Sequence, residues 1–254
     1  MKKFKKLIPA LCMLLVSAVM LGSTTFAWFS MNTTVTASNM QVQAKADQVY
    51  LQIKEKSKEF TANGNHTSVP STVTKKSLLP TNVYKTFDET TPEAFAGGKD
   101  FVWVSNYSVD ADKSDKAGSY TNVTPQVDSY ALKFEYTIRL RPGTGATVAP
   151  GKLKVTAVEF EEDKSATSGL KGAVSVLVVC GDYSAVYKQT TTTGTFTKSA
   201  GDEALSAAAF ASVDGTDVAV YVFFDGDNAN CKTTNIVLND TFSVKITFNC
   251  NADA

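Results

Sequence analysis

The chain has 254 residues, of which 25 are basic and 25 acidic, so its formal net charge is zero. Hydrophobic residues make up 43% and aromatic residues 10% of it, which is enough for a sizeable core. No basic patch and no aromatic ladder flanked by arginine stands out in the sequence, which argues against nucleic acid as a partner.

The segment 1–27 has the three parts of an export signal. Four lysines precede an apolar stretch at 7–21, and small residues then lead to Thr25-Phe26-Ala27, where a signal peptidase finds small side chains at −3 and −1. An apolar stretch of about 15 residues is short for a membrane anchor, which needs about 20. We therefore predict a signal peptide over 1–27, a mature chain that begins at Trp28, and membrane contact only before cleavage.

The segment that follows this junction alternates in polarity. Its larger or less polar residues are Phe29, Met31, Thr33, Val35 and Ala37, with Ser, Asn and Thr between them. Period-2 alternation predicts a β-strand. This strand either begins its own sheet or, once cut free, enters the sheet of another subunit, because both states use the same pattern.

Similar alternation recurs along the chain. "YALKFEYTIRLR" at 130–141 and "TFSVKITFNC" at 241–250 each place every second residue on an apolar face, which is typical of half-buried antiparallel strands. "VSVLVVC" at 174–180 and "VAVYVFF" at 218–224 are apolar on both faces and suit central strands. "QVYLQIKEK" and "FVWVSNY" are further candidates, and "KLKVTAVEF" shifts phase between Val155 and Val158, which predicts a β-bulge.

Helical signals are few. Only "DEALSAAAFASV" at 202–213, which is rich in alanine and begins with acidic residues, resembles a helix. Turn-rich stretches separate the strands, and the loops at 57–100 and 108–128 are long enough to hold insertions. We predict an all-β, antiparallel, two-sheet β-sandwich with long loops and at most one or two short helices. Residues 28–254 form a single domain in this prediction, with 28–45 as its first strand or a strand given to a neighbour.

Three cysteines remain after signal cleavage, because Cys12 lies within the signal. Cys180 is in phase with the valines that precede it, so we interpret it as a small buried hydrophobic residue. Cys231 and Cys250 are the better candidates for one disulfide, and three reduced thiols are the alternative.

Residues for catalysis are scarce. The chain has one histidine, His66, in a polar loop without an acidic neighbour, so neither a two-histidine metal site nor a serine or cysteine triad is expected. Neighbouring acids at the end of a strand (Glu159, Glu161 and Glu162) do not face each other across a cleft, as glycoside hydrolysis requires. The sequence therefore predicts no enzyme and no cofactor.

Two acidic stretches have spacings that resemble cation-binding loops. "DGDNANC" contains Asp225 and Asp227, and "DADKSD" lies at 110–115. Neither has the glycine at position 6 or the acid at position 12 of an EF-hand loop. We interpret both as turns and keep Asp225 and Asp227 as weak metal candidates.

The junction "TTFAWFSMNTTVTASNMQVQAK" resembles the processing region of the TasA/camelysin-like family of exported biofilm-matrix fibre proteins. In that family a dedicated signal peptidase cuts near an aromatic-alanine-aromatic junction, which matches Phe26-Ala27-Trp28 here. The stretch "VYVFFDGDNANC" and the closing strand "FSVKITF" are similar to the ends of many exported relatives. The likeness covers about a quarter of the chain, and residues 80–215 do not contribute to it.

The resemblance implies a jelly-roll sandwich that assembles into extracellular fibres. It also implies that the freed N-terminal segment joins the next subunit as a donated strand, with Phe29, Met31, Val35 and Ala37 on its shared face. The expected partners are copies of the chain or related matrix subunits, besides the signal peptidase. Camelysin's described protease activity is not expected here, because this sequence offers no residues that could carry it out.

An alternative class is a secreted β-sandwich module that binds carbohydrate or another ligand. Such a module needs an exposed aromatic platform, for which Trp103, Tyr107 and Tyr120 are the candidates. In either case the expected location is outside the cell, in the matrix or at the cell surface.

Overall fold

The computed structural model describes residues 34–37, 40–45, 51–61, 66, 68–71, 76–106, 119–142, 147–160, 169–189, 195–205, 215–231 and 241–250. For 34–37, 40–45, 76–77, 169–170 and 241–242 only the backbone is described. The predicted signal peptide, including Thr25 and Ala27, and Trp28, Phe29 and Met31 lie outside the described residues, as do the acidic stretch 110–115 and Tyr107.

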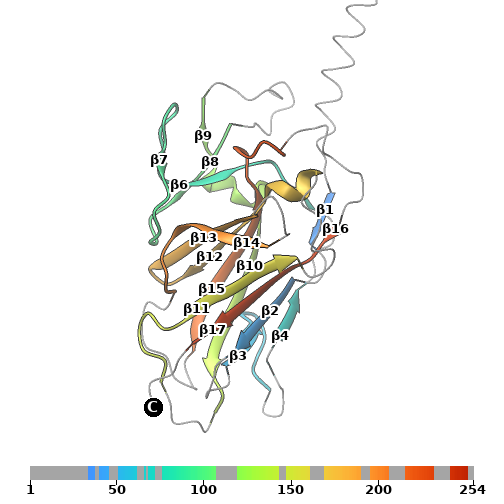
Figure 1. The fold of residues 1–254 in the computed structure, drawn as a ribbon, viewed down its shortest axis with the longest axis vertical. Coiled ribbons are helices and arrows are strands. Elements are labelled where there is room, and N and C mark those ends of the chain that lie inside the picture. Colours follow the sequence, from blue (N-terminus) through green and yellow to red (C-terminus); the bar gives the residue numbers. More distant parts are fainter. Residues whose placement is uncertain are drawn as a thin grey trace, which may run out of the picture.

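The described chain is all-β, as predicted, and most neighbouring strands are antiparallel (Figure 1). The largest sheet has six strands, in the order β14 (Phe196–Gly201), β13 (Tyr183–Gln189), β12 (Val174–Cys180), β15 (Thr216–Phe224), β10 (Ala131–Leu140) and β3 (Leu51–Glu55). A four-stranded sheet packs against one of its faces, in the order β11 (Lys154–Phe160), β17 (Val244–Asn249), β2 (Met40–Lys45) and β4 (Ser68–Ser71).

Two smaller sheets complete the described fold. One has the order β7 (Glu93–Ala94), β6 (Asn82–Thr86), β8 (Val102–Ser105) and β9 (Thr121–Asn122). The other has the order β16 (Thr241–Phe242), β1 (Thr34–Ala37) and β5 (Lys76–Ser77). The described residues also form two short 3-10 helices, η1 (Thr124–Ser129) and η2 (Gly169–Ala173).

The main core lies between the six-stranded sheet and the sheet that contains β17. Alternate residues of the long strands whose side chains are described enter it, as the sequence pattern predicts. The inward residues of two strands show the pattern: Leu132, Phe134, Tyr136, Ile138 and Leu140 of β10, and Val244, Ile246, Phe248 and the adjacent Cys250 of β17. The hydroxyl of Tyr136 donates to Ser71 Oγ at 3.0 Å, so this buried hydroxyl is satisfied.

A second core lies on the other face of the six-stranded sheet, beneath β6 and β8. Leu177 of β12, Val186 of β13 and Phe223 of β15 point into it, between neighbours that point into the main core. Trp103 of β8 is 3% exposed, and its ring centroid lies 5.1 Å from that of Phe223. This second layer explains why β12 and β15 are apolar on both faces.

Local irregularities follow the sequence in two places. The register of β11 against β17 shifts between Val155 and Ala157, which confirms the predicted β-bulge. The register of β13 against β14 also shifts, between Val186 and Tyr187, and the same strand pair contains Gly201, whose φ is +104°. A Cβ at that glycine would lie 2.6 Å from Ala185 Cα, so only glycine fits there.

Two sequence interpretations need correction. Residues 82–86, 93–94 and 121–122 are strands of the β6–β9 sheet, so much of the region interpreted as long loops is structured, whereas β8 lies within the predicted strand "FVWVSNY". The described part of the predicted helix, 202–205, is not helical, and the remainder lies outside the described residues. Short strands such as β7 and β9 contain too few residues to show a period. The finer jelly-roll assignment stays a prediction.

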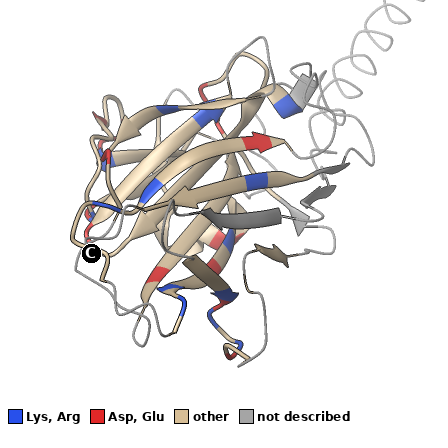
Figure 2. Ribbon diagram, turned by 60° about the horizontal axis from the view of Figure 1, so that its bottom comes forward, with Lys and Arg blue, Asp and Glu red and all other residues tan. Residues whose placement is uncertain are grey.

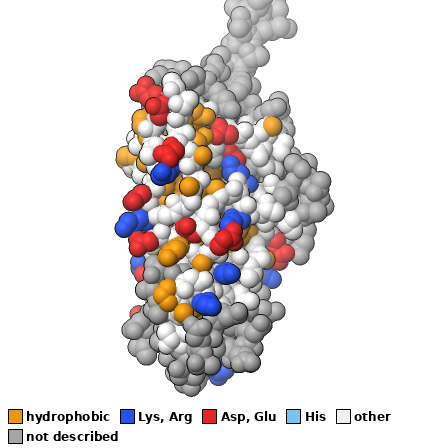
Figure 3. Space-filling view, turned by 60° about the vertical axis from the view of Figure 1, so that its left-hand side comes forward, with side chains coloured by type: hydrophobic (Ala, Val, Ile, Leu, Met, Phe, Trp, Pro, Cys, Tyr) orange, Lys and Arg blue, Asp and Glu red, His pale blue; other side chains and the backbone are white. Residues whose placement is uncertain are grey.

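Charges of both signs are interspersed over the described surface (Figure 2). Lys56 Nζ lies 3.0 Å from an Asp217 oxygen, and Lys85 Nζ lies 2.7 Å from Glu93 Oε1. Figure 3 shows the side of the molecule that carries β7 and β13, where hydrophobic side chains lie between charged ones. Among the described residues, Phe87 is the only large hydrophobic side chain that counts as exposed, at 38%.

Candidate functional site

The first candidate site is the position of the N-terminal segment. β1, which contains Val35 and Ala37, pairs in parallel with β16 and antiparallel with β5. β2 then pairs in parallel with β17 and antiparallel with β4. Residues 36–37 therefore run beside 241–242, and residues 41–45 beside 245–249, in the same direction (Figure 1).

β2 occupies an interior place in its sheet. Gln41 to Lys45 are in register with Lys245 to Asn249 on one side, and Met40 to Gln43 with Ser71 to Ser68 on the other. Neither neighbour is joined to β2 by a tight hairpin, since β17 lies near the opposite end of the chain and β3 intervenes before β4. β2 can therefore be separated from both neighbours without breaking a hairpin.

Withdrawal of β2 would leave two facing edges. Strands in a sheet are about 4.8 Å apart, so β17 and β4 would border a slot one strand wide. Their main-chain N–H and C=O groups toward the slot would lose their partners, which is unfavourable unless another strand or water replaces them. Pro70 lies in β4, the edge strand, where a missing N–H donor is tolerated.

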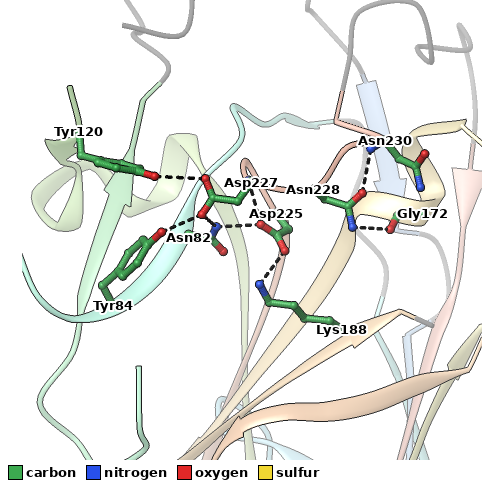
Figure 4. Close-up of polar contacts among 9 residues, drawn as sticks. All are labelled: Asn82, Tyr84, Tyr120, Gly172, Lys188, Asp225, Asp227, Asn228 and Asn230. Atoms are coloured by element: carbon green, nitrogen blue, oxygen red, sulfur yellow. Dashed lines mark hydrogen bonds and ion pairs between the residues drawn. The ribbon is translucent and has the colours of Figure 1, made fainter. Parts of the chain in front are cut away.

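The second candidate site is a polar cluster at the junction of the six-stranded sheet and the β6–β9 sheet (Figure 4). β6 supplies Asn82 and Tyr84, and β13 supplies Lys188. Asp225 directly follows β15, and Asp227 lies in the turn after it. Side chains that are distant in sequence, such as those of Asn82 and Asp225, therefore meet here.

Asp225 is the centre of this cluster. It is 3% exposed, and its carboxylate accepts hydrogen bonds from Asn82 Nδ2 at 2.7 Å, Lys188 Nζ at 2.7 Å and the Asp227 N–H at 3.0 Å. A buried carboxylate is stable only with such partners. The ion pair with Lys188 is partly open to solvent, since the Lys188 side chain is 37% exposed.

Asp227 is exposed to solvent, whereas Asp225 is buried. Its Oδ2 accepts hydrogen bonds from Asn82 Nδ2 at 2.5 Å and from the Tyr84 hydroxyl at 2.7 Å, and the Tyr120 hydroxyl lies 3.4 Å from its Oδ1. The two tyrosine rings meet edge to face, 5.9 Å apart. Burial, followed by the hydrogen bond to Asp227, raises the pKa of Tyr84 well above its ordinary value, so this hydroxyl is a donor at neutral pH.

The turn that carries these acids is fixed by its own polar groups. The Asn228 side chain donates to the Gly172 carbonyl at 3.2 Å and accepts from the Asn230 N–H at 2.8 Å. The Thr81 N–H donates to the Phe224 carbonyl at 2.9 Å, so the turn is tied to the strand that carries Asn82. The "DGDNAN" sequence is therefore a turn, as interpreted, and its acids are held in place.

The geometry around Asp225 and Asp227 is that of a hydrogen-bonded network. Asp225 Oδ2 accepts from Lys188 Nζ, and its Oδ1 accepts from Asn82 Nδ2 and the Asp227 N–H, so both oxygens have protein donors. Within the described ranges, no three His, Cys, Asp or Glu side chains come together as a metal site. These two carboxylates hold protein donors in place.

A cavity of about 340 Å³ opens beside this network. Its polar lining, here called the polar wall, includes Asn82, Tyr84, Lys188 and Asp227, and its apolar lining includes Phe95 and Val186. Such a volume is at the small end of the range for ligand pockets, about 300–1,000 Å³.

The aromatic residues that the sequence suggested for an exposed platform lie in different environments. Trp103 is buried in the second core, so its proposed place in an exposed platform is wrong. Tyr120 lies beside Asp227, where its partner ring is Tyr84, which sequence reasoning missed. The short pattern of β6 shows Tyr84 only as one residue of a five-residue strand, so no local signal marked it.

Of the two cysteine alternatives, the structure has three free thiols and not one disulfide among the described cysteines. Cys180, Cys231 and Cys250 are buried, and among the described cysteines none forms a disulfide. The bridge between Cys231 and Cys250 is therefore absent in this structure. Both side chains belong to the main core, where a thiol packs as a small hydrophobic group. Cys180 is 0% exposed and packs in phase with the valines of β12, as predicted.

The single histidine has a local role. His66 Nε2 accepts a hydrogen bond from the Thr61 N–H at 3.0 Å, and its ring meets the Phe60 ring edge to face, with the centroids 5.3 Å apart.

Of the three neighbouring acids, only Glu159 is described. Glu159 of β11 lies 4.0 Å from Lys245 Nζ of β17, and Glu161 and Glu162 lie outside the described residues.

Comparison with known proteins found no family model, no curated protein and no solved structure that matches this chain. None of the described residues belongs to a helix with the length and apolar character of a membrane span.

Proposed function

We propose that this chain is an exported structural subunit of extracellular biofilm-matrix fibres, which assembles head-to-tail by donation of its N-terminal strand. The observation that carries the proposal is the place of β2 between β4 and β17. The export signal and the junction that resembles the TasA/camelysin-like family support the location and the kind of assembly.

Strand donation follows from three properties of β2. It lies close behind the predicted cleavage site, it is not joined to either neighbour by a hairpin, and it is paired on both sides. An incoming strand from another subunit would make the same main-chain hydrogen bonds, so the exchange conserves the pairing. Each subunit would then give one strand and accept one, which produces an open filament when the rotation does not close.

We place the donated strand further along the chain than the sequence alone suggested. Val35 and Ala37 lie in β1, which pairs in a small sheet with β16 and β5. β2 belongs instead to the sheet that closes the main core, with Val42 in register with Ile246 and Ala44 with Phe248. We therefore place the principal contribution to affinity at residues 40–45, with β1 and the preceding residues extending the contact.

The role that we infer is structural and not enzymatic, without a cofactor. The partners are other copies of the chain or related matrix subunits, after a signal peptidase has removed 1–27. The product is located in the extracellular matrix or at the cell surface.

The test uses two single-cysteine variants, Gln43→Cys and Thr247→Cys, mixed in equal amounts under fibre-forming conditions and then oxidised. These positions are in register, and neighbouring strands bring Cα atoms within the range that a disulfide bridges, about 4.4–6.8 Å. Thr247 lies on a half-exposed position of β17 and the native thiols are buried, so background coupling is low. A covalent dimer that contains one copy of each variant is expected.

The matched control mixes Gln43→Cys with Thr137→Cys, a half-exposed position of β10 that is in register with β15 and β3. This mixture should give no mixed dimer. Fibres seen by electron microscopy without the 43–247 dimer would contradict strand donation, and persistent monomers under all conditions would contradict the fibre function itself.

A further inference from the structure

The cavity beside Asp227 is a feature that fibre assembly does not use. It lies between β6, β13 and β14, whereas the proposed donated strand lies between β4 and β17. We propose that this cavity binds one neutral sugar residue, with Asp227, Asn82, Lys188 and Tyr84 as its polar contacts.

The polar wall is organised before any ligand arrives. Asp225 is almost fully buried and holds both the Asn82 amide and the Lys188 ammonium, each at 2.7 Å. Asn82 and Tyr84 in turn hold Asp227. Because these groups are already fixed, a ligand does not have to order them on binding.

Two side chains of the polar wall, Lys188 and Asp227, can form further hydrogen bonds. In the bonds recorded among the described residues, the Lys188 ammonium uses one of its three donors, on Asp225. The carboxylate of Asp227 has about four acceptor positions, and its Oδ1 has only the long contact with Tyr120. A ligand that both donates to Asp227 and accepts from Lys188 fits this arrangement.

Charge selects the class of ligand. One cation, Lys188, stands against two carboxylates, Asp225 and Asp227, so the local charge is negative and an anion is repelled. A metal cation would have to displace the ammonium of Lys188. A hydroxyl both donates and accepts, so a neutral polyhydroxylated ring satisfies the acceptor and the donor together.

The apolar part of the lining favours a ring with apolar faces. Phe95 is 8% exposed and Val186 4%, and both line the cavity. The C–H faces of a sugar can pack on such a surface while its hydroxyl groups meet the polar wall. The volume of about 340 Å³ admits a unit of one ring, either a free sugar or a residue at the end of a polysaccharide. This gives the alternative function expected from the sequence a defined location.

The test is isothermal titration calorimetry of the purified protein. The probes are glucose, galactose, mannose and N-acetylglucosamine, a neutral polymer (dextran), and glucuronate as the anionic comparison. At least one neutral probe should bind at one site per chain, and glucuronate should bind more weakly than glucose. Preference for a monosaccharide over dextran would identify a free sugar as the source, and the reverse would identify a polymer.

Asp227→Asn is the decisive variant, because it keeps the shape and removes the charged acceptor. Loss of a hydrogen bond to a charged group should weaken binding about tenfold or more. Asp217→Asn is the matched control, since Asp217 also accepts from a hydroxyl, Thr137 Oγ1 at 2.8 Å, but lies outside the cavity. Its affinity should change less than about twofold.

Ala94→Trp is a second variant that does not depend on the network. Ala94 is exposed, is in register with Tyr84 and lines the cavity, so an indole there should obstruct the opening while the fold is kept. Binding should be lost with an unchanged unfolding midpoint. The proposal is overturned if no neutral probe binds, if glucuronate binds best, or if both Asp227→Asn and Ala94→Trp bind like the wild type. Each of these outcomes leaves strand donation untouched.

Discussion

The two faces of the six-stranded sheet are covered in different ways. One face meets the sheet that contains β17 over the length of β10, through aliphatic and aromatic side chains that alternate regularly. The other face meets the β6–β9 sheet near the start of β10 and the end of β15, through Trp103, Tyr130 and Phe223. Beyond that cover, β10 presents Lys133, Glu135 and Thr137 to solvent or to partly exposed surroundings.

This difference shows that the residue types on each face of a strand depend on whether that face is covered by another sheet. β12 and β15 lie in the middle of the sheet with both faces covered, so both faces are apolar. β10 is covered on both faces only at its beginning, where Ala131 belongs to the second core. The second core is smaller and is closed at one side by the polar network around Asp225, so its stability depends on hydrogen bonds as well as on burial.

The largest expected effect is in the main core. Phe248→Ala removes a side chain that is 0% exposed and leaves a cavity between the two large sheets. The free energy of unfolding should fall by about 3–5 kcal/mol. Urea unfolding followed by circular dichroism measures it. A change below about 1 kcal/mol would show that the two sheets are not closely packed at this position.

The network at the edge of the second core should give a smaller effect. Asp225→Ala leaves the Asn82 amide and the Lys188 ammonium without their shared acceptor, at a cost of about 2–3 kcal/mol, discounted for the solvent that reaches Lys188. Asp225→Asn, which keeps one acceptor, should cost less. Urea unfolding followed by tryptophan fluorescence and by circular dichroism tests this. Separate transitions in the variant would show that the second core unfolds on its own.

Alkaline pH should weaken the main core through Cys250. Burial raises the pKa of this thiol from 9.0 to about 11. Below pH 9 the thiol is protonated in both states, and stability does not depend on it. Between pH 9 and 11 the thiol ionises only in the unfolded chain, so unfolding becomes easier by about 2–3 kcal/mol, and above pH 11 this dependence ends.

The measurement is the difference in unfolding free energy between wild type and Cys250→Ala across this pH range. The variant should lack this part of the pH dependence. Iodoacetamide provides a second check, because the folded wild type should protect Cys250 at pH 8 and the urea-unfolded chain should not. Rapid alkylation of folded protein at this residue would contradict its burial.

The smallest effect is expected where the six-stranded sheet is uncovered. Glu135 lies 3.2 Å from Lys133 Nζ and 3.9 Å from Lys56 Nζ, and its side chain is 44% exposed. Glu135→Gln should change the free energy of unfolding by no more than about 0.5 kcal/mol. Thermal and urea unfolding measure it. A loss as large as that expected for Asp225→Ala would mean that this part of the sheet is also covered.

The strands of the main core could be predicted because their signal is local. The alternation in β10 and β17 is visible within each strand's own sequence, and the β-bulge in β11 is visible as a phase shift. Of the β6–β9 sheet only β8, within "FVWVSNY", was predicted, because β7 and β9 have two residues each. No period can be recognised in so short a segment.

The candidate sites were predictable only in part. Asp225 and Asp227 stood out as an acidic pair in one turn, but Asn82 and Lys188 come from strands far away in sequence. Nothing near Asn82 indicates that its amide meets a buried carboxylate. Similarly, the segment after the predicted cleavage site could be interpreted as a strand, but its partners could not be identified.

The sequence by itself determined the all-β class and which residues of the long strands share a face. The physical reason is the two-residue period of a β-strand, which any sheet imposes on its own chain. Only the tertiary structure decided which faces are covered, that β2 lies between β4 and β17, and that Asp225 collects donors from β6 and β13. These arrangements depend on pairing between segments from opposite ends of the chain, such as β2 and β17, and a local pattern contains no information about its distant partner.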